Sequence, residues 1–524
     1  MRPLLGEALR FDLTELEGLD LLSYPDGPIR EAQRLAAAAW GAAHTWFLVN
    51  GSTAGIQAAV MATCGGPGDA LVLGRNAHLS AFTAAALAGC APGWAPPARR
   101  HGLAHHVTPA ALEAAFAGAE LRGLRPRAAL VVSPTYFGII SDVAGLAEVC
   151  ARRGAALIVD EAHGAHLRFL EGLPGDPGAD GNAAPLPDLG ALRAGADLAV
   201  QSAHKTLSAL TQGAVLHAEG AGRADPGRVS RALQALQTSS PSYLVMASLD
   251  AARAQAQDPG AVAAAHAAAR HIRAFFDGPD TGEGAAHNTA TTTSSSSSSS
   301  RTSALEEPHG RPRLRLLTPA SLGGAGGAGA CVAADPWRFT VLVHEFGCSG
   351  WEAAAALERE WGVVPELATA GAVVFAAGMG TSMADAERLR AALAAFAARR
   401  APPRGAAQRP PARAASIGDD DSEEEEEIDI EVVLSPRQAL QAGSEAVPAG
   451  AAAGRVGAEL LCPYPPGVPA IYPGARVTPA ALARLRAVLA GGGRVTGAAD
   501  PSLDTLRVIC EADVRAWRRA PSSS

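Results

Sequence analysis

The stretch "DLAVQSAHKTLSALTQGAVLH", residues 197–217, contains the features that decide the fold. Two short apolar runs, at 197–202 and 213–217, enclose a polar segment that holds Lys205. Lys205 is the only lysine among the 44 lysine and arginine residues of the chain. Arginine is permanently charged, whereas a desolvated lysine amine can lose its proton and attack a carbonyl carbon. Lys205 is therefore either a chance remnant of an arginine-rich composition or a nucleophile that arginine cannot replace.

Similar apolar runs occur upstream and alternate with segments that are typical of helices. These helical segments are amphipathic and rich in alanine, as at 54–63, 109–117 and 142–152. Continuous apolar runs separated by helices are typical of βαβ units, in which both faces of the sheet are covered. The pattern predicts an α/β fold with a mostly parallel, buried sheet. The expected strands are "TWFLVN" ending at Asn50, "ALVLG" at Gly74, "AALVVS" at Ser133, "AALIVDE" at Glu161, "DLAVQS" at Ser202 and "GAVLH" at His217.

Polar residues follow five of these strands at the point where each strand ends. Ligands of parallel sheets bind at the carboxyl ends of the strands, so these residues are expected at one edge. This clustering favours a catalytic role for Lys205 over a chance remnant. The five exits are "GSTAG" (51–55), "RNAH" (75–78), "PTYFG" (134–138), "DEAHGAH" (160–166) and "SAHKT" (202–206).

Composition and charge exclude several classes of function. The net charge of −8 argues against nucleic acid as a main partner, because nucleic-acid binding favours basic faces. No apolar run is long enough to cross a bilayer, which predicts a protein without a membrane partner. The N-terminus becomes acidic early, unlike a secretory or transit peptide, and the seven cysteines form no CxxC pair. The chain is therefore expected to be soluble and intracellular, in the cytoplasm or a plastid.

Three of the strand exits predict the anchors of a pyridoxal phosphate site. "NGSTAG" opens a helix, where free backbone N–H groups can bind phosphate, although such a stretch is more often a simple capped turn. A P-loop is excluded because its motif needs a lysine there, and without it "DEAH" cannot be a nucleotide site. A metal at His163 and His166 is disfavoured because no third ligand or HExxH motif accompanies them. Asp160 instead suits a protonated pyridine nitrogen, and Lys205 suits the aldehyde.

Six motifs in order resemble the Orn/Lys/Arg decarboxylase family. The resemblance covers nearly the whole chain and is closest to the shorter members, which lack an N-terminal receiver-like region. It implies an aspartate-aminotransferase-like fold (fold type I) around pyridoxal 5'-phosphate, with smaller α/β segments after it. The motifs are "FLVNGSTAGIQAAVMA", "VVSPTYFG", "VDEAHGAH", "QSAHKTLSALTQ", "TSSPSYLVMASLDAAR" and "CPYPPGVPAIYPG".

The resemblance also implies roles for individual residues. Lys205 would attach the cofactor covalently, Asp160 would pair with its ring nitrogen, and His78 would stack on the ring as a third catalytic residue. The remaining cofactor contacts would come from Ser52, Thr53, Ala54, Ser202 and His204 at the phosphate and from His163 beside the ring. No metal is implied. Leu79 stands where members commonly have lysine, and Ala475 where they often have glutamate, which puts substrate or subunit contacts in question.

The domain boundaries follow from changes in composition. Serine- and threonine-rich or acidic stretches cannot bury enough apolar area to fold, so two disordered segments are expected. The expected parts are an N-terminal segment with the cofactor-binding major domain at 1–278, a disordered insert at 279–312, a small α/β domain at 313–400, an acidic disordered linker at 401–454 and a C-terminal decarboxylase-type domain at 455–524.

The implied reaction is decarboxylation of arginine, lysine or ornithine to agmatine, cadaverine or putrescine and CO2, which would feed polyamine synthesis. The implied assembly is a homodimer or a larger homo-oligomer, because enzymes of this fold usually complete their active site with a second subunit. Two alternatives remain open from the residues: another enzyme on the same cofactor, such as an aminotransferase or a Cα–Cβ lyase, and a non-catalytic, decarboxylase-like regulatory protein.

Overall fold

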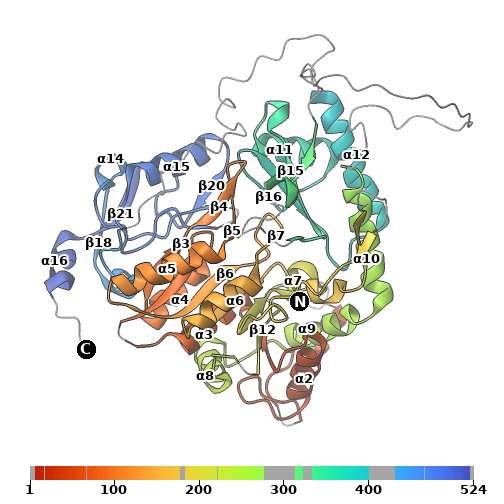
Figure 1. Cartoon of the computed structure of the whole chain (residues 1–524), viewed down its shortest axis with the longest axis horizontal. Helices are drawn as coiled ribbons and strands as arrows, with labels where there is room; N and C mark the ends of the chain where they lie inside the picture. The colour runs from red at the N-terminus through yellow and green to blue at the C-terminus, as the bar shows by residue number, and fades with distance from the viewer. Residues whose placement is uncertain are drawn as a thin grey trace, which may run out of the picture.

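The chain is built around one seven-stranded sheet, as the computed structural model shows (Figure 1). The structure describes residues 6–519 except 17, 67, 178–182, 221, 277–312, 323–332, 401–430 and 465–466. The expected insert at 279–312 therefore lies outside the described residues. The strand order is β1-β12-β11-β8-β6-β2-β3, with strands β1 (His44–Leu48), β2 (Asp69–Gly74), β3 (Ala91–Ala95), β6 (Arg125–Val132), β8 (Ala156–Asp160), β11 (Leu198–Gln201) and β12 (Ala214–Ala218).

The sheet is mostly parallel, as the sequence predicts. Only β12 is reversed within it, since β12 pairs antiparallel with both β1 and β11. Strand β1 therefore runs in the same direction as β11, and the five strand exits lie at one edge of the sheet. Strand β3 was not predicted, because "APGWA" lacks the continuous apolar run of the other strands.

Helices cover both faces of the sheet, which explains the apolar runs. Leu71 and Leu130 pack with the helices of one face, whereas Val72 and Val131 pack with those of the other. The first face is covered by α3 (Gly51–Thr63), α4 (Leu79–Ala88) and α8 (Pro226–Leu236), and the second by α5 (Pro109–Leu121) and α6 (Val143–Arg152).

A second, smaller sheet lies next to the edge of the main sheet at which the parallel strands end. Its antiparallel order is β13-β15-β17-β16, and the expected strand signal "WRFTVLVHEFG" forms β15. Three helices of the major domain, α2 (Pro28–Trp40), α9 (Tyr243–Ala256) and α10 (Pro259–Arg273), share one core with it. The remaining elements are β13 (Arg315–Leu316), β15 (Arg338–Leu342), α11 (Gly350–Trp361), β16 (Leu367–Ala368), β17 (Ala372–Ala376) and α12 (Met383–Arg400).

The C-terminal segment begins earlier than expected. Residues 431–454, assigned to the linker from sequence, form α13 (Pro436–Gln441), β18 (Ser444–Pro448) and α14 (Ala449–Ala452). Ser435 and Gln438 cap α13 reciprocally, and β18 pairs with the distant β21 (Thr505–Ile509), so local composition did not reveal the strand. The remainder comprises β19 (Cys462–Tyr464), α15 (Pro479–Ala490), β20 (Arg494–Thr496) and α16 (Glu511–Arg519).

Short elements connect these layers. No helix among the described residues is both long and apolar enough to cross a membrane. The short elements are η1 (Gly6–Arg10), β4 (Pro97–Arg100), β5 (Leu103–Val107), β7 (Ile139–Ile140), η2 (Leu167–Leu170), β9 (Pro174–Pro177), β10 (Ala183–Pro185), α7 (Ala203–Thr206), η3 (Ala320–Leu322), β14 (Ala333–Ala334) and η4 (His344–Phe346).

The close approach of α3 to the sheet generates a stability prediction. A Cβ at Gly55 would lie 2.6 Å from Leu48 Cδ1 and 2.8 Å from Val200 Cγ1, whereas one at Gly118, on the exposed side of α5, meets open space. We expect Gly55→Ala to lower the free energy of unfolding by about 1–3 kcal/mol through overpacking. The control, Gly118→Ala, should raise it by roughly 0.5–1 kcal/mol through helix propensity. Urea unfolding followed by circular dichroism measures both, and an unchanged Gly55→Ala variant would contradict the described packing.

Candidate active site

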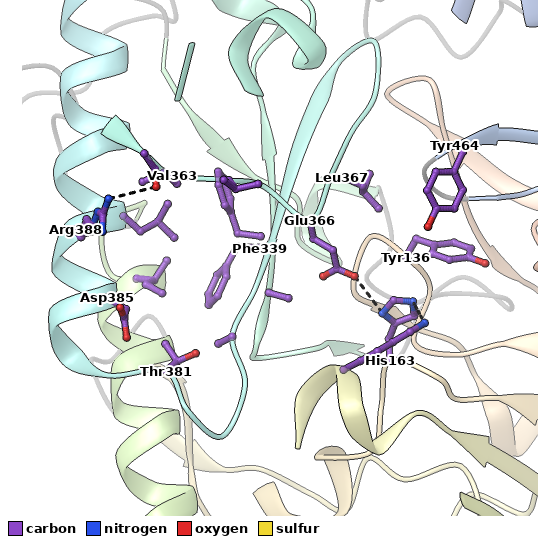
Figure 2. Close-up of a pocket in the computed structure, with 18 of the residues that line it drawn as sticks. Tyr136, His163, Phe339, Val363, Glu366, Leu367, Thr381, Asp385, Arg388 and Tyr464 are labelled. Atoms are coloured by element: carbon purple, nitrogen blue, oxygen red, sulfur yellow. Dashed lines mark hydrogen bonds and ion pairs between the residues drawn. The ribbon is translucent and has the colours of Figure 1, made fainter. Parts of the chain in front are cut away.

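A cavity of about 680 Å³ lies where the strand exits of the major domain face the small sheet (Figure 2). Three residues expected at the cofactor, His78, His163 and Lys205, line it. Tyr136 comes from the exit of β6, and Tyr464 comes from the C-terminal segment. The cavity is therefore lined by residues of the major domain, the small domain and the C-terminal segment.

Lys205 lies on the short helix α7 directly after β11. Its Nζ lies 3.1 Å from Nε2 of His163. Burial lowers the pKa of Lys205, and the carboxylates of Asp160 and Glu366 oppose this effect. The lowered pKa makes the neutral amine, which is the nucleophilic form, easier to reach than it is for a solvated lysine.

Asp160 ends β8 at the same edge of the sheet and is 5% exposed. Its Oδ1 accepts a hydrogen bond of 3.2 Å from the Ala162 backbone N–H. Burial raises the pKa of Asp160, whereas the nearby His78 and Lys205 lower it. A buried carboxylate in this position is suited to a cationic partner such as a protonated pyridine nitrogen.

The neighbouring carboxyl, Glu161, directly follows β8 and does not line the cavity. It accepts hydrogen bonds from Gln201 Nε2 and from the Ala191 backbone N–H. Burial raises the pKa of Glu161 to about 8. Glu161 is therefore a structural group beside the site.

The start of α3 and the segment before Lys205 meet at one corner of the site. The Asn50 side chain does not cap α3, so the N–H groups of its first turn, which includes Ser52, Thr53 and the buried Ala54, remain available. Ser202 Oγ is fully buried and has no partner among the described residues. The Gln212 carbonyl accepts from Gly51 N, and the Gly213 carbonyl accepts from both His204 N and His204 Nδ1, which joins the two segments. An uncapped helix start beside an unpaired hydroxyl fits a phosphate group.

His78 precedes α4 and forms its N-cap. Its Nδ1 accepts from the Ser80 backbone N–H at 3.2 Å, and burial lowers the pKa of the ring. A Cβ at Gly467 would lie 3.4 Å from His78 Cδ2, so the C-terminal segment packs against the imidazole. The Leu79 backbone N–H donates to the Gly467 carbonyl. The position where Leu79 departs from the family pattern thus still holds the C-terminal segment through its backbone.

Two residues singled out from sequence lie elsewhere. His166 Nε2 lies 2.8 Å from Asp335 Oδ1, and its ring stacks on Trp337 with the centroids 4.6 Å apart. Ala475 is buried with Tyr472 in the core cluster between the main sheet and α3, α4 and α8, and it does not line the cavity. Across the described part of the chain, no group of three His, Cys, Asp or Glu side chains is arranged to hold a metal ion.

Sequence reasoning missed two charged residues of the small domain. Arg338 begins β15, and Glu366 directly precedes β16. The Arg338 guanidinium bonds to His163 Nδ1 at 2.5 Å and to Glu366 at 3.1 and 3.3 Å. Neither residue stands in a recognisable motif, and only the packing of the small sheet onto the major domain brings them to Lys205.

A lysine with a lowered pKa, a buried aspartate and an uncapped helix start beside a buried hydroxyl fit a pyridoxal phosphate site. The family models for the Orn/Lys/Arg decarboxylase major and C-terminal domains match residues 4–282 and 422–499 of the chain. The chain belongs to the Orn/Lys/Arg decarboxylase family, whose members are pyridoxal phosphate-dependent carboxy-lyases acting on basic amino acids. The family and the fold expected from sequence are confirmed.

Similar proteins agree with this membership. An arginine decarboxylase from Bacillus subtilis is 31% identical over 516 residues, which cover 97% of this chain and 91% of that protein. An arginine decarboxylase from Bacillus anthracis is 30% identical over 507 residues, or 96% and 89% of the two chains. The constitutive lysine decarboxylase of E. coli has the same fold, with a TM-score of 0.68, 19% identity, and coverage of 96% of this chain and 76% of that chain.

Two substitutions at Lys205 test whether its role depends on the amine group or only on its positive charge. We expect Lys205→Ala and Lys205→Arg both to lose the visible absorption of bound cofactor after gel filtration, and to lose turnover. Lys205→Arg is the sharper variant, because it keeps a cation of similar length but cannot condense with an aldehyde. If Lys205→Arg retained the visible band, covalent attachment at this position would be wrong.

Proposed function

We propose that the protein converts a basic L-amino acid, arginine foremost, to the corresponding amine and CO2, as a step toward polyamines. The observation that carries the proposal is the cavity itself, in which the amine of Lys205 is accompanied by the carboxylates of Glu366 and Asp385 along the wall. The arginine decarboxylases from Bacillus, which match nearly the whole chain, support arginine over lysine and ornithine.

The cavity is suited to an amino acid with a long, positively charged side chain. Its middle is lined by apolar groups, including Phe339 and Leu367, which suit a methylene stem. Glu366 lies between this wall and His163, and Asp385 lies at the far end on α12 (Figure 2). Asp385 accepts hydrogen bonds from Ser382 N and Oγ, which orient the carboxylate. A guanidinium group bonds to such carboxylates in a charge-assisted manner.

The residue roles that we propose at the cofactor follow the geometry of the site. Lys205 attaches the cofactor, and the α3 start with Ser52, Thr53 and Ala54 binds its phosphate. Ser202 and His204 complete the phosphate site, His78 stacks on the ring, and His163 lies beside it. When bound, pyridoxal phosphate accepts the electrons that remain when the substrate carboxylate leaves as CO2.

The chain's own residues control charge and protons around that step. Asp160 is buried, so its carboxylate would stabilise a proton on the ring nitrogen of the bound cofactor with little screening by water. Lys205, once released, is positioned to return a proton to the substrate carbon, since its pKa is lowered toward neutrality by burial. Burial also lowers the pKa of His78, so the neutral ring that is left suits stacking better than acid catalysis.

A homodimer is the assembly that we infer. Large apolar side chains near the N-terminus are exposed in the single chain, including Phe11 at 63% and Tyr24 at 76%. A second subunit would cover such side chains and remove apolar area from water. Family membership supports the same assembly.

The substrate assignment is tested by CO2 and amine release from arginine, lysine and ornithine. We expect both products from arginine with the highest kcat/KM. We expect Asp385→Asn to raise KM for arginine by roughly tenfold with little change in kcat, because the lost ion pair is distant from the reacting carbon. The control is Glu387→Gln, a charge-matched change on the same helix at a residue that does not line the cavity. Amine-group transfer or aldehyde release without CO2 would instead identify an aminotransferase or a lyase, and no turnover with bound cofactor a non-catalytic protein.

Removing the charge of Asp160 tests its proposed role. We expect Asp160→Asn to bind cofactor but to lower turnover by roughly 10²–10³-fold, because a neutral amide does not stabilise a protonated ring. Glu161→Gln is the matched control one residue away, since it makes the same acid-to-amide change at a residue that does not line the cavity and keeps one of the two acceptor oxygens. Wild-type turnover by Asp160→Asn would contradict the role, and equal losses in both variants would indicate only damaged packing.

A further inference from the structure

The imidazole of His163 stands between the side chains of Arg338 and Lys205. On one side its Nδ1 lies 2.5 Å from an Arg338 guanidinium nitrogen, and on the other its Nε2 lies 3.1 Å from Lys205 Nζ. The ring is buried, with only 6% of the side chain exposed. The proton of this ring must therefore be placed by its two partners rather than by water.

Arg338 decides where that proton lies. Guanidinium has five N–H donors, no acceptor, and does not lose its charge in proteins. Nδ1 must therefore accept from Arg338, which leaves the N–H of neutral imidazole on Nε2. An Nε2–H points at Lys205 and requires a lone pair on Nζ, which the ammonium form does not have. Burial, with Arg338 and Lys205 close by, lowers the pKa of His163 well below its usual value, which agrees with a neutral ring.

Several contacts fix the position of Arg338. Its NH1 donates to the Tyr136 carbonyl at 3.0 Å, and both terminal nitrogens pair with Glu366. The stem packs against the backbone of Gly138, where an added Cβ would lie 2.9 Å from Arg338 Cβ. The guanidinium is thus held by the exit of β6 and by the small domain together.

A buried acid–imidazole pair supports the segment that carries Arg338. Asp335 bonds to His166, which follows His163 by three residues, and both side chains are 1% exposed. The Asp335 backbone N–H donates to the Gly138 carbonyl, and the Arg338 backbone N–H donates to the Asp335 carbonyl. The loop of His163 and the strand of Arg338 are therefore joined at two places.

We propose that Arg338 is a positioning residue that fixes His163 as the Nε2–H tautomer, so that His163 donates to Lys205 and holds it as the free amine ready to capture the cofactor aldehyde. The inference rests on the proposed function in one respect, namely that Lys205 is the attachment residue. It does not depend on which amino acid is decarboxylated.

The other charged groups around Lys205 act in both directions. Asp160 and Glu366 favour the ammonium form, whereas Arg338 and burial oppose it. His78 and His204 also face Lys205, and each has its own pKa lowered mainly by burial. The effect of nearby charges on the Lys205 pKa must therefore be separated from the effect of the hydrogen bond with His163. The sign of the pKa change in a His163 variant separates them.

The wild-type chain provides the first test, because a chain with one lysine gives one Nζ signal. The full-length protein is stripped of cofactor, ¹⁵N-labelled at lysine and histidine, and shown to reload with pyridoxal phosphate. We expect a Lys205 pKa below that of a solvated lysine, and a His163 ring with a pyridine-type Nδ1 and a pyrrole-type Nε2. The opposite tautomer, or an ammonium that titrates at the ordinary pKa, overturns the proposal. This readout needs no turnover, so its failure is distinguishable from failure of the decarboxylase assignment.

Substitutions test the direction. We expect His163→Phe, which keeps a planar ring at this position, to raise the Lys205 pKa by roughly one pH unit, because the free amine loses its donor. If His163 instead accepted from an ammonium, the same change would lower the pKa. We expect Arg338→Met also to raise it, and to slow covalent capture of pyridoxal phosphate at neutral pH by about tenfold for each unit of rise.

The double variant separates the two contributions. Without Arg338, the Nδ1–H of His163 can donate to Glu366 Oε1, 3.5 Å away, and Nε2 can then accept from the Lys205 ammonium. In the Arg338→Met background, His163→Phe should therefore lower the Lys205 pKa, the reverse of its effect in the wild-type chain. The control Arg388→Met removes an equal charge from the other end of the cavity and should leave the pKa unchanged. A His163→Phe effect of the same sign in both backgrounds overturns the role of Arg338.

Discussion

Lys205 carries the only side-chain amine of the chain, and that amine lies on the cavity wall against His163, close enough to Asp160 and Glu366 to feel their charges. Desolvation by the walls of the site lowers the pKa of this amine and so shifts it toward the neutral form. The neutral form is the one that condenses with an aldehyde. Asp160 and Glu366 pull in the opposite direction, and their charges are in turn engaged by other groups. The residues packed around the site therefore set the pKa of Lys205.

Three separate segments of the chain meet to produce that environment. The major domain contributes the strand exits, which converge because β1, β2, β6, β8 and β11 all run in one direction. The small domain contributes Arg338 and Glu366, and the C-terminal segment contributes Tyr464 and the packing of Gly467 against His78. The surroundings of the lysine therefore depend on all three segments being in place.

Sequence reasoning was successful where chemistry and local pattern coincide. The buried strands gave continuous apolar runs, and Lys205 and Asp160 stood at the strand exits. It failed where a contact depends on distant packing. Arg338 resembles any other of the chain's many arginines until β15 is placed against His163. Strand β18 looked like linker because its partner β21 lies some sixty residues further along the chain. Strand β3 was missed because Gly93 and Pro92 interrupt its apolar pattern.

The most direct measurement is the location of the covalent link in the protein as purified with its cofactor. Borohydride reduction fixes the cofactor to the amine that holds it, and peptide mapping by mass spectrometry then identifies that amine. The account predicts a pyridoxyl group on the single lysine-containing peptide, at Lys205. A label on the N-terminal amine, or an unlabelled protein that remained active after reduction, would contradict it.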